Sequence, residues 1–308
     1  MKAFIVSQDK PDVTKRFLHI KNMKWSYFLF LLPALLFYLV FFFYPVLLGF
    51  FYSFTNWDGI AKSYKVIGLK NYASILQDMR FLQAIKFTFT YALMYVILKL
   101  TLALIIALLL NGNMKLRGFF RSVYFFPAVL SLITVSLVFN QLFYAVIPRI
   151  GEGLGLEWLS QNLLSQKETA VFGIIIANLW HGFSVPMVIF LAGLASVPKD
   201  LHEAATIDGA SPFQRFISIT VPFLIPMLNV NLVISIKGAL TVFESIMAMT
   251  GGGPASATES VGYLIYQHGI NDFKFAYATA ESICIFVIVA VISVIQIKVL
   301  NRKEAGQQ

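Results

Sequence analysis

The sequence has few charged residues. Only 13% of its 308 residues are Asp, Glu, Lys or Arg, whereas soluble domains carry about 25%. Hydrophobic residues make up 58%, and the mean hydropathy is +0.75. This balance excludes one large soluble core and indicates a polytopic membrane protein. The net charge of +9 then reflects basic loops on one side of a membrane, so nucleic acid is not an expected partner.

Cysteine and the common catalytic motifs are also scarce. Cys284 is the single cysteine, which excludes a disulfide framework and a cysteine-based metal site. The glycine tract 251–254 lacks the Gly-Lys-Ser/Thr ending of a nucleotide-binding loop. The chain also has no His-Glu-x-x-His or Gly-x-Ser-x-Gly pattern. We therefore expect no catalytic residue, no metal site and no cofactor in this chain.

What the sequence does have is six long apolar runs. A hydrocarbon core takes about 20 helical residues, and lipid offers no partner for unpaired backbone groups. Each run therefore predicts an α-helix, and the expected fold class is an all-α polytopic membrane protein with six transmembrane helices. We place these helices at residues 25–51, 87–110, 123–143, 171–197, 222–249 and 276–297.

The basic residues predict the orientation of the chain. The segments predicted on the same face of the membrane as the amino terminus carry 14 Lys and Arg residues, and the segments on the other face carry 8. The positive-inside rule then puts both termini in the cytoplasm. The polar arm 1–24 does not have the form of a cleavable signal. We expect one membrane domain at 25–300 and a cytoplasmic tail at 301–308, in the inner or plasma membrane of a bacterial cell, where lipid surrounds the chain.

A polar segment at 198–222 separates the fourth and fifth runs, on the predicted cytoplasmic side. Pro198 suits the first position of a helix, because a proline loses no hydrogen bond there. Glu203 then follows near the helix start, where negative charge meets the helix dipole favourably. Gly209 suits a left-handed stop. The first half of the segment is therefore predicted to be a short helix that ends at Gly209.

A second short helix is predicted to follow at once. Ser211 can cap it, and Gln214 stands three residues later, as a capping box requires. Pro222 disfavours helical geometry at the residue before it, so this helix is expected to end near Thr220. The two helices would enclose a fixed corner.

The surface of this segment permits two interpretations. Ala204 and Ala205 are small and allow another protein to approach closely, while Phe213, Phe216 and Ile217 give a larger apolar face. A bent apolar element beside the Glu203 carboxylate suits docking into a cleft. The alternative is a well-capped loop that folds against its own helices.

The segment resembles a known family motif. Glu203-Ala204-Ala205, then Gly209, then nine residues and Ile219-Thr220-Val221-Pro222 is similar to the EAA signature of bacterial ABC importer permeases. Asp208 and Phe216 also fit the form found in carbohydrate importers. Further stretches resemble the sugar-permease subgroup, namely YPVLLGFFYSFTNWDG, GLKNYASIL, RGFFRSVYFFPAVLS and MTGGGPASATES. The last of them resembles the half related to the larger permease subunit of the maltose transporter.

The resemblance implies a type I ABC importer permease fold and a set of partners. Residues 198–222 would be the coupling helix, seated on a separate ABC ATPase dimer that carries ATP and Mg. Glu203 would be its charge partner, with Ala204, Ala205 and Gly209 permitting the fit. A second homologous permease would enclose the pathway, and an extracytoplasmic solute-binding protein would deliver a carbohydrate, taken as an oligosaccharide. Glycerol phosphate or another polar solute is the alternative substrate.

Polar residues at membrane depth are candidates for the substrate pathway, because burying them unpaired is costly. Lys237, Thr241 and Glu244 are spaced i, i+4, i+7 in the fifth run, which predicts one helical stripe. The further candidates are Lys99, Tyr91, Tyr95, Asn178 and Trp180. The alternative is structural: these lysines, and His181, pair with carboxylates or carbonyls and touch no substrate.

Two other classes of protein remain open from the sequence. A secondary transporter would work without an ATPase but usually shows broken helices in paired repeats, which the sequence does not reveal. A membrane scaffold without transport would need neither the capped cytoplasmic corner nor the charges at membrane depth.

Overall fold

The protein is mostly helical in the residues that a computed structural model describes, 13–112 and 114–305. No strand occurs among these residues, and Thr55 and Val66 form an isolated antiparallel bridge. Five helical stretches are long and apolar enough to cross a membrane, and one bent helix pair makes a sixth. The predicted all-α polytopic fold class is confirmed. Part of the predicted arm (1–12) and tail (306–308) lies outside the described residues.

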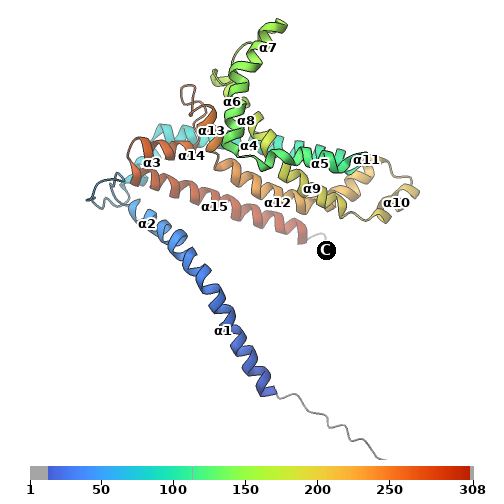
Figure 1. The fold of residues 1–308 in the computed structure, drawn as a ribbon, viewed down its shortest axis with the longest axis horizontal. Coiled ribbons are helices and arrows are strands. Elements are labelled where there is room, and N and C mark those ends of the chain that lie inside the picture. The colour runs from blue at the N-terminus through green and yellow to red at the C-terminus, as the bar shows by residue number, and fades with distance from the viewer. Residues whose placement is uncertain (1–12, 113, 306–308) are drawn as a thin grey trace, which may run out of the picture.

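The first apolar run forms one long helical rod. α1 (Val13–Tyr38) continues through the π-helix η1 (Leu39–Phe43) into α2 (Tyr44–Tyr52). Pro45 has no N–H to donate, and the wider π turn before it lets the helix continue past it. α2 packs against α15 (Phe275–Ala305), but α1 points away from all other helices (Figure 1). The apolar side chains from Tyr27 to Tyr44 are consequently exposed.

The centre of the molecule is a bundle of long helices. α4 (Met79–Asn111) packs against α9 (Ser184–Ala195) and α12 (Val221–Leu240), and α12 packs against α15 (Figure 1). Small residues permit these close approaches, as is common between helices in membranes. A β-carbon on Gly193 of α9 would lie 2.6 Å from Met227 Cγ of α12, so only glycine fits there.

The prediction of one helix at 123–143 is wrong. α5 (Arg117–Phe125) passes into the 3₁₀ helix η2 (Phe126–Val129), and Leu130 and Ser131 are then extended. A new stretch follows at a steep angle, made of α6 (Leu132–Gln141), the π-helix η3 (Leu142–Val146) and α7 (Ile147–Leu154) (Figure 1). This stretch, not 123–143, is long enough to span a membrane. Pro127, which cannot donate a backbone hydrogen bond, stands where the first helix stops.

The fourth and fifth runs are also interrupted. α8 (Lys167–Gly182) and α9 meet at a bend of 47°, because Pro186 lacks an N–H for the Gly182 carbonyl and its ring crowds that carbonyl. The fifth run, predicted as 222–249, ends as α12 at Leu240 and resumes as α13 (Glu244–Met249). Ser260 donates a 2.7 Å hydrogen bond to the carbonyl of Val242 within this break.

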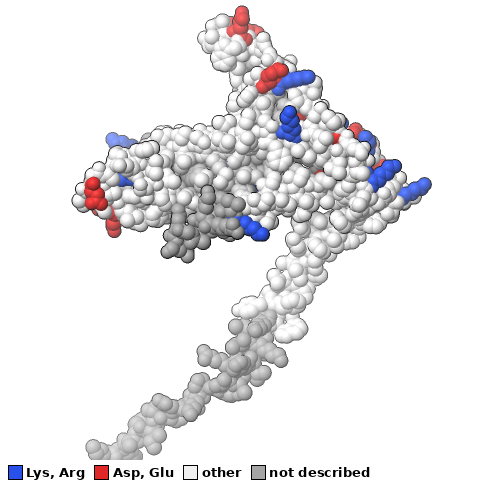
Figure 2. Space-filling view, turned by 180° about the vertical axis from the view of Figure 1, so that it is seen from behind, with Lys and Arg blue, Asp and Glu red and all other residues white. Residues whose placement is uncertain are grey.

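The two ends of the bundle carry the short elements. One end holds α3 (Lys70–Gln77), α14 (Val261–Tyr266) and the π-helix η5 (Gln267–Asn271). The opposite end holds α10 (Lys199–Ile207), α11 (Pro212–Arg215) and the π-helix η4 (Phe216–Thr220). In Figure 2, charged side chains gather at these ends and on the projecting α6–α7 stretch, while the long surface between them is nearly uncharged. That distribution suits a bundle that lies in lipid.

Candidate functional site

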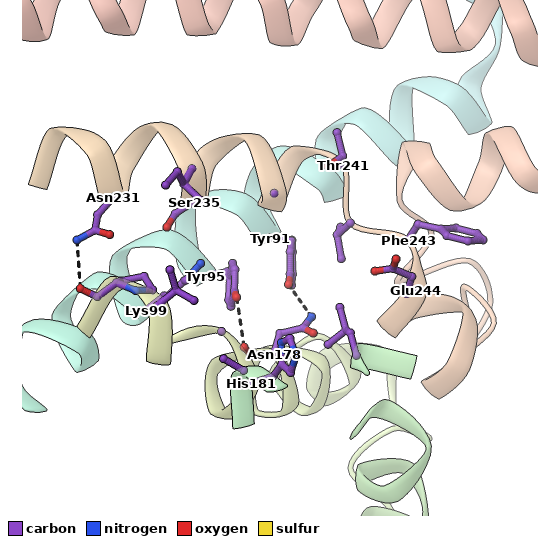
Figure 3. A pocket seen from close by; sticks show the side chains of 18 residues that line it. Tyr91, Tyr95, Lys99, Asn178, His181, Asn231, Ser235, Thr241, Phe243 and Glu244 are labelled. Atoms are coloured by element: carbon purple, nitrogen blue, oxygen red, sulfur yellow. Dashed lines mark hydrogen bonds between the residues drawn. The ribbon is translucent and has the colours of Figure 1, made fainter. Parts of the chain in front are cut away.

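A cavity of about 550 Å³ lies between the helices of the bundle. Its walls come from α4, the η2–α6 junction, the α8–α9 bend, α12 and the break before α13 (Figure 3). Six of the eight residues predicted for a substrate pathway line it: Tyr91, Tyr95, Lys99, Asn178, Thr241 and Glu244. Three apolar runs far apart in the sequence thus bring most of the polar candidates to one place.

One wall is a row of three side chains on α4. Tyr91, Tyr95 and Lys99 follow each other at four-residue spacing and therefore share a helix face. The two tyrosine rings stack with centroids 5.4 Å apart, and Lys99 Nζ lies 5.4 Å from the centroid of the Tyr95 ring. Lys99 is 8% exposed and forms no ion pair with any described residue. A buried ammonium group stabilised chiefly by an aromatic face is a ready donor for a ligand.

Asn178 of α8 is bonded to this row. Its side-chain Nδ2 donates to Tyr91 Oη at 2.7 Å and to Ser245 Oγ at 2.9 Å. The Tyr95 hydroxyl donates to the Asn178 backbone carbonyl at 3.2 Å. These bonds use both amide hydrogens and leave Asn178 Oδ1 buried without a partner. Asn178 therefore has one free acceptor at the cavity.

The α8–α9 bend brings two more groups to the cavity. Gly182 lies against the Tyr95 hydroxyl, so closely that a β-carbon at residue 182 would overlap it. His181 Nε2 is 3.0 Å from the Leu130 carbonyl, which the extended backbone after η2 leaves free. One ring nitrogen of His181 is thus paired with a backbone carbonyl, as the structural alternative predicts. His181 also lines the cavity.

Asn231 and Ser235 of α12 were missed by the sequence analysis. Asn231 Nδ2 donates to the Pro186 carbonyl at 3.3 Å, while Asn231 Oδ1 and Ser235 Oγ are buried without partners. Both residues line the cavity (Figure 3). A signal was present: two neutral polar residues at i and i+4 in an otherwise apolar run predict one polar stripe. Neither residue is ionisable, so the criterion of charge at membrane depth does not select them.

Two predicted pathway residues lie elsewhere. Lys237 is exposed on α12 and does not line the cavity. Trp180 lies beside Phe139, with ring centroids 5.7 Å apart, over a separate apolar hollow of about 300 Å³. The predicted stripe of Lys237, Thr241 and Glu244 is wrong because α12 ends at Leu240. The Thr241 hydroxyl bonds back to the Lys237 carbonyl at 3.0 Å, and the chain leaves the helix there.

The segment 198–222 forms the second candidate site. Pro198 stands at the N-cap, one position before the predicted one, and α10 ends in a Schellman motif. In this motif the N–H groups of Gly209 and Ala210 donate to the carbonyls of Thr206 and Ala205, at 3.1 and 2.9 Å. Gly209 has φ +77°, as the predicted left-handed stop requires.

The second half begins as predicted but ends differently. Ser211 and Gln214 form a complete capping box. The helix does not stop near Thr220, because η4 carries it through a π turn into α12, with Val221 in ordinary helical geometry. Pro222 has no N–H to donate, and the widened π turn tolerates the missing hydrogen bond. Residues Pro212–Leu240 are therefore one continuous helical rod.

The outer surface of this segment is uncovered and carries large apolar side chains beside charged ones. α10 projects beyond the end of the bundle (Figure 1), and Glu203, Ala204, Asp208 and Gly209 are exposed, whereas Ala205 and Phe216 are half-buried. Four large apolar side chains are exposed beside them: Leu201, Ile207, Phe213 and Ile217. This exposure disfavours the alternative in which the segment folds against its own bundle.

An apolar bundle with a polar inner cavity and an exposed, rigid corner at one end defines a membrane-spanning transport subunit. The family model described as "Binding-protein-dependent transport system inner membrane component" matches residues 99–304. The multiple sugar-binding transport system permease protein MsmF of Streptococcus mutans is 39% identical over 285 residues, which cover 92% of this chain and 98% of that protein.

Two further comparisons agree. The trehalose/maltose transport system permease protein MalF of Thermococcus litoralis is 35% identical over 276 residues, 88% of this chain and 92% of that protein. A crystal structure of a bacterial ABC transporter involved in the import of alginate matches with a TM-score of 0.80 at 23% identity, over 93% of this chain and 99% of that chain. It shows the fold.

The chain belongs to the family of binding-protein-dependent transport system inner membrane components. It is a multi-pass permease subunit with the ABC importer permease fold, and it is not an enzyme. The resemblance noted in the sequence is thereby confirmed.

Proposed function

We propose that this permease subunit passes an oligosaccharide through the cavity between α4, α8, α9 and α12. One observation carries the proposal: Asn178 Oδ1, Asn231 Oδ1 and Ser235 Oγ are buried, unpartnered and on residues that line one cavity. A buried polar group without a partner costs about 1–3 kcal/mol. Three such groups together are best explained by a ligand that supplies hydrogen bonds.

The chemistry of the cavity fits a polyhydroxylated ligand. Sugar hydroxyls both donate and accept, so they can satisfy the two amide oxygens and the ammonium of Lys99 at once. The stacked rings of Tyr91 and Tyr95 offer an apolar wall for the C–H faces of a sugar. A volume of about 550 Å³ lies within the range of about 300–1,000 Å³ usual for small-molecule sites. The named sugars of the relatives support the same class.

Glycerol phosphate fits the cavity less well. Lys99 would attract its phosphate, but the Glu244 carboxylate lines the same cavity and would repel a second negative charge. A neutral sugar meets no such conflict. Uptake of a neutral oligosaccharide and of glycerol 3-phosphate, measured side by side, distinguishes the two substrates.

The exposed corner at α10–α11 would dock on an ATPase. Its apolar side chains need a cover, its Schellman motif and capping box hold a fixed shape, and Glu203 supplies an exposed charge beside them. ATP and Mg would then be bound by the ATPase dimer and not by this chain. This assignment places the corner, and both termini, in the cytoplasm.

Two other partners complete the proposed assembly. The uncovered apolar rod of α1 and α2 (Figure 1) suits lipid on one side and a second homologous permease on the other. A solute-binding protein would deliver the sugar at the α3–α14 end. ATP binding would draw the docked corners together and tilt the two permeases between inward- and outward-facing states.

The test is purification of the tagged chain from native membranes, followed by reconstitution with its binding protein in proteoliposomes. We expect an ATPase and a second permease to co-purify, and sugar uptake to require ATP inside the vesicles. Retention of ATPase and full transport after Gly209→Pro would overturn the docking assignment, since proline cannot adopt the φ of residue 209. Uptake in the absence of any ATPase would indicate a secondary transporter.

A further inference from the structure

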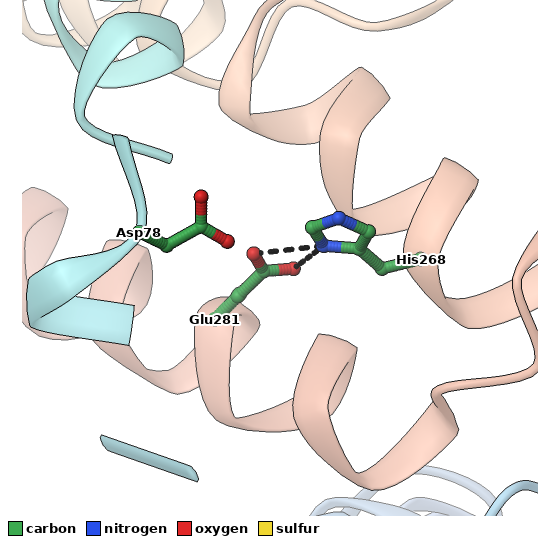
Figure 4. A group of neighbouring side chains, drawn as sticks. All are labelled: Asp78, His268 and Glu281. Carbon is green, nitrogen blue, oxygen red and sulfur yellow. Dashed lines mark hydrogen bonds and ion pairs between the residues drawn. The ribbon is translucent and has the colours of Figure 1, made fainter. Parts of the chain in front are cut away.

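A group of three ligand-type side chains, one half-buried and two buried, lies at the α3–α14 end of the bundle, away from the cavity. Asp78 caps the start of α4, His268 lies in the π-helix η5, and Glu281 lies on α15 (Figure 4). Each residue offers one ligand atom, an oxygen or a nitrogen, and these three atoms all lie within 4.8 Å of one another. His268 is 4% exposed and Glu281 is fully buried. Three separate elements thus converge on one point.

Hydrogen bonds hold the three side chains in place. His268 Nδ1 is 3.0 Å from both carboxylate oxygens of Glu281, close to the separation of neighbouring ligands at bond lengths of about 2.0–2.2 Å. Asp78 Oδ2 accepts a 2.9 Å hydrogen bond from the Tyr277 hydroxyl. Hydrogen bonds of this kind orient the primary ligands in metal sites.

The charge balance also calls for a cation. Arg80 is the nearby cation, but its guanidinium donates to both carboxylate oxygens of Glu259, at 2.9 and 2.7 Å. Glu281 is left with His268 as its partner. The Asp78 oxygens accept hydrogen bonds from Tyr277 and from the backbone N–H groups of Arg80 and Phe81, and Asp78 forms no ion pair with any described residue. A protonated histidine balances one of the two carboxylates, whereas a divalent ion beside a neutral histidine balances both. Buried carboxylates are stable only when they are paired or bound to a metal.

We propose that Asp78, His268 and Glu281 bind a divalent transition-metal ion. One imidazole and two carboxylates form a donor set that suits Zn²⁺, with a fourth position for water. The ion would join the start of α4, η5 and α15, and α4 continues from there to the cavity-lining Tyr91, Tyr95 and Lys99. The sequence alone predicts no metal site here, because the ligands are far apart in the chain and form no spaced motif.

The experiment uses the full-length chain, purified in detergent without chelator and with an affinity tag other than polyhistidine. Bound metal is measured by mass spectrometry after gel filtration, and thermal unfolding is followed after EDTA treatment and after addition of ZnCl₂ or MnCl₂. We expect about one zinc per chain, a lower unfolding temperature after EDTA, and its recovery with ZnCl₂. The wild-type chain gives this answer without any variant.

Variants then locate the ion. His268→Gln keeps a hydrogen-bond donor for Glu281 but removes the ligand, so it should retain no zinc and show no ZnCl₂-dependent shift. His202→Gln, which changes a distant half-exposed histidine, should behave as wild type. Tyr277→Phe should weaken zinc binding about tenfold, as loss of a supporting hydrogen bond does. The proposal is overturned if EDTA-treated wild type binds neither ion, or if His268→Gln responds to ZnCl₂ as wild type does.

Discussion

Gly182 and Tyr95 are in direct contact at the wall of the cavity, where the absence of a side chain on residue 182 leaves space for the tyrosine hydroxyl. That hydroxyl donates to the carbonyl of Asn178 on the same turn of α8. Through this contact the bend between α8 and α9 is held against α4. The shape of the cavity therefore depends on one glycine.

Gly182→Ala should reduce sugar uptake strongly while the chain still inserts in the membrane. The added β-carbon overlaps the Tyr95 hydroxyl, so α4 and α8 must separate. With Tyr95→Phe in the same chain, the nearest remaining ring atom would be 3.4 Å away, and uptake should partly recover. Tyr95→Phe alone loses one hydrogen bond, worth about 0.5–1.5 kcal/mol. A double variant no better than Gly182→Ala would contradict this account.

Lys99→Met should lower uptake about tenfold or more at limiting substrate, because a hydrogen bond to a charged group contributes about 1.5–3 kcal/mol. Lys237→Met is the matched control, since Lys237 is exposed outside the cavity. We expect it to transport normally. The sequence-based hypothesis that Lys237 lines the pathway predicts instead that Lys237→Met lowers uptake. Uptake by the two variants in proteoliposomes decides whether Lys237 is part of the pathway.

Gly209→Ala should weaken coupling to the ATPase. Gly209 has φ +77°, and a residue with a β-carbon is roughly 1–2 kcal/mol less stable than glycine in this left-handed conformation. An alanine there would favour another backbone conformation, and the corner would lose its fixed shape. Gly68→Ala is a close control: Gly68 has φ +62°, and neither position has a neighbouring atom within 4 Å. Substrate-stimulated ATPase activity should fall in Gly209→Ala and stay unchanged in Gly68→Ala. Equal losses would show that strain, not docking, is responsible.

Ser211→Ala should give a milder loss of the same activity. The Ser211 hydroxyl accepts the Gln214 N–H within the capping box, and removal of such a cap costs about 1 kcal/mol of helix stability. Ser211→Asp keeps a capping oxygen and should retain activity. If Ser211→Asp is impaired as much as Ser211→Ala, the hydroxyl has a role other than capping.

Local chemistry predicted the short elements well. Gly209 and the Ser211–Gln214 box depend on hydrogen bonds between residues a few positions apart, so the sequence contains all that is needed. The apolar runs likewise predicted where most long helices lie, since each must satisfy its own backbone in lipid.

The interruptions inside the runs could not be predicted in the same way. Apolar composition does not tell whether Thr241 continues a helix or leaves it, and the break is supported by Ser260, far along the chain. The cluster of Asp78, His268 and Glu281 is likewise a product of packing. The sequence also did not predict that the helix continues past Pro222, because it does so through a π turn.

That last continuity has a mechanical consequence. From the Ser211 cap onward the chain is one helical rod of 29 residues, Pro212–Leu240, about 40 Å long at the usual rise per residue. Asn231 and Ser235 lie on this rod, and its other end is the corner that carries Gly209. A displacement of the corner is thus transmitted to two unpaired polar groups of the cavity along one continuous helix, in which the π turn of η4 and Pro226 are the two places where it can bend.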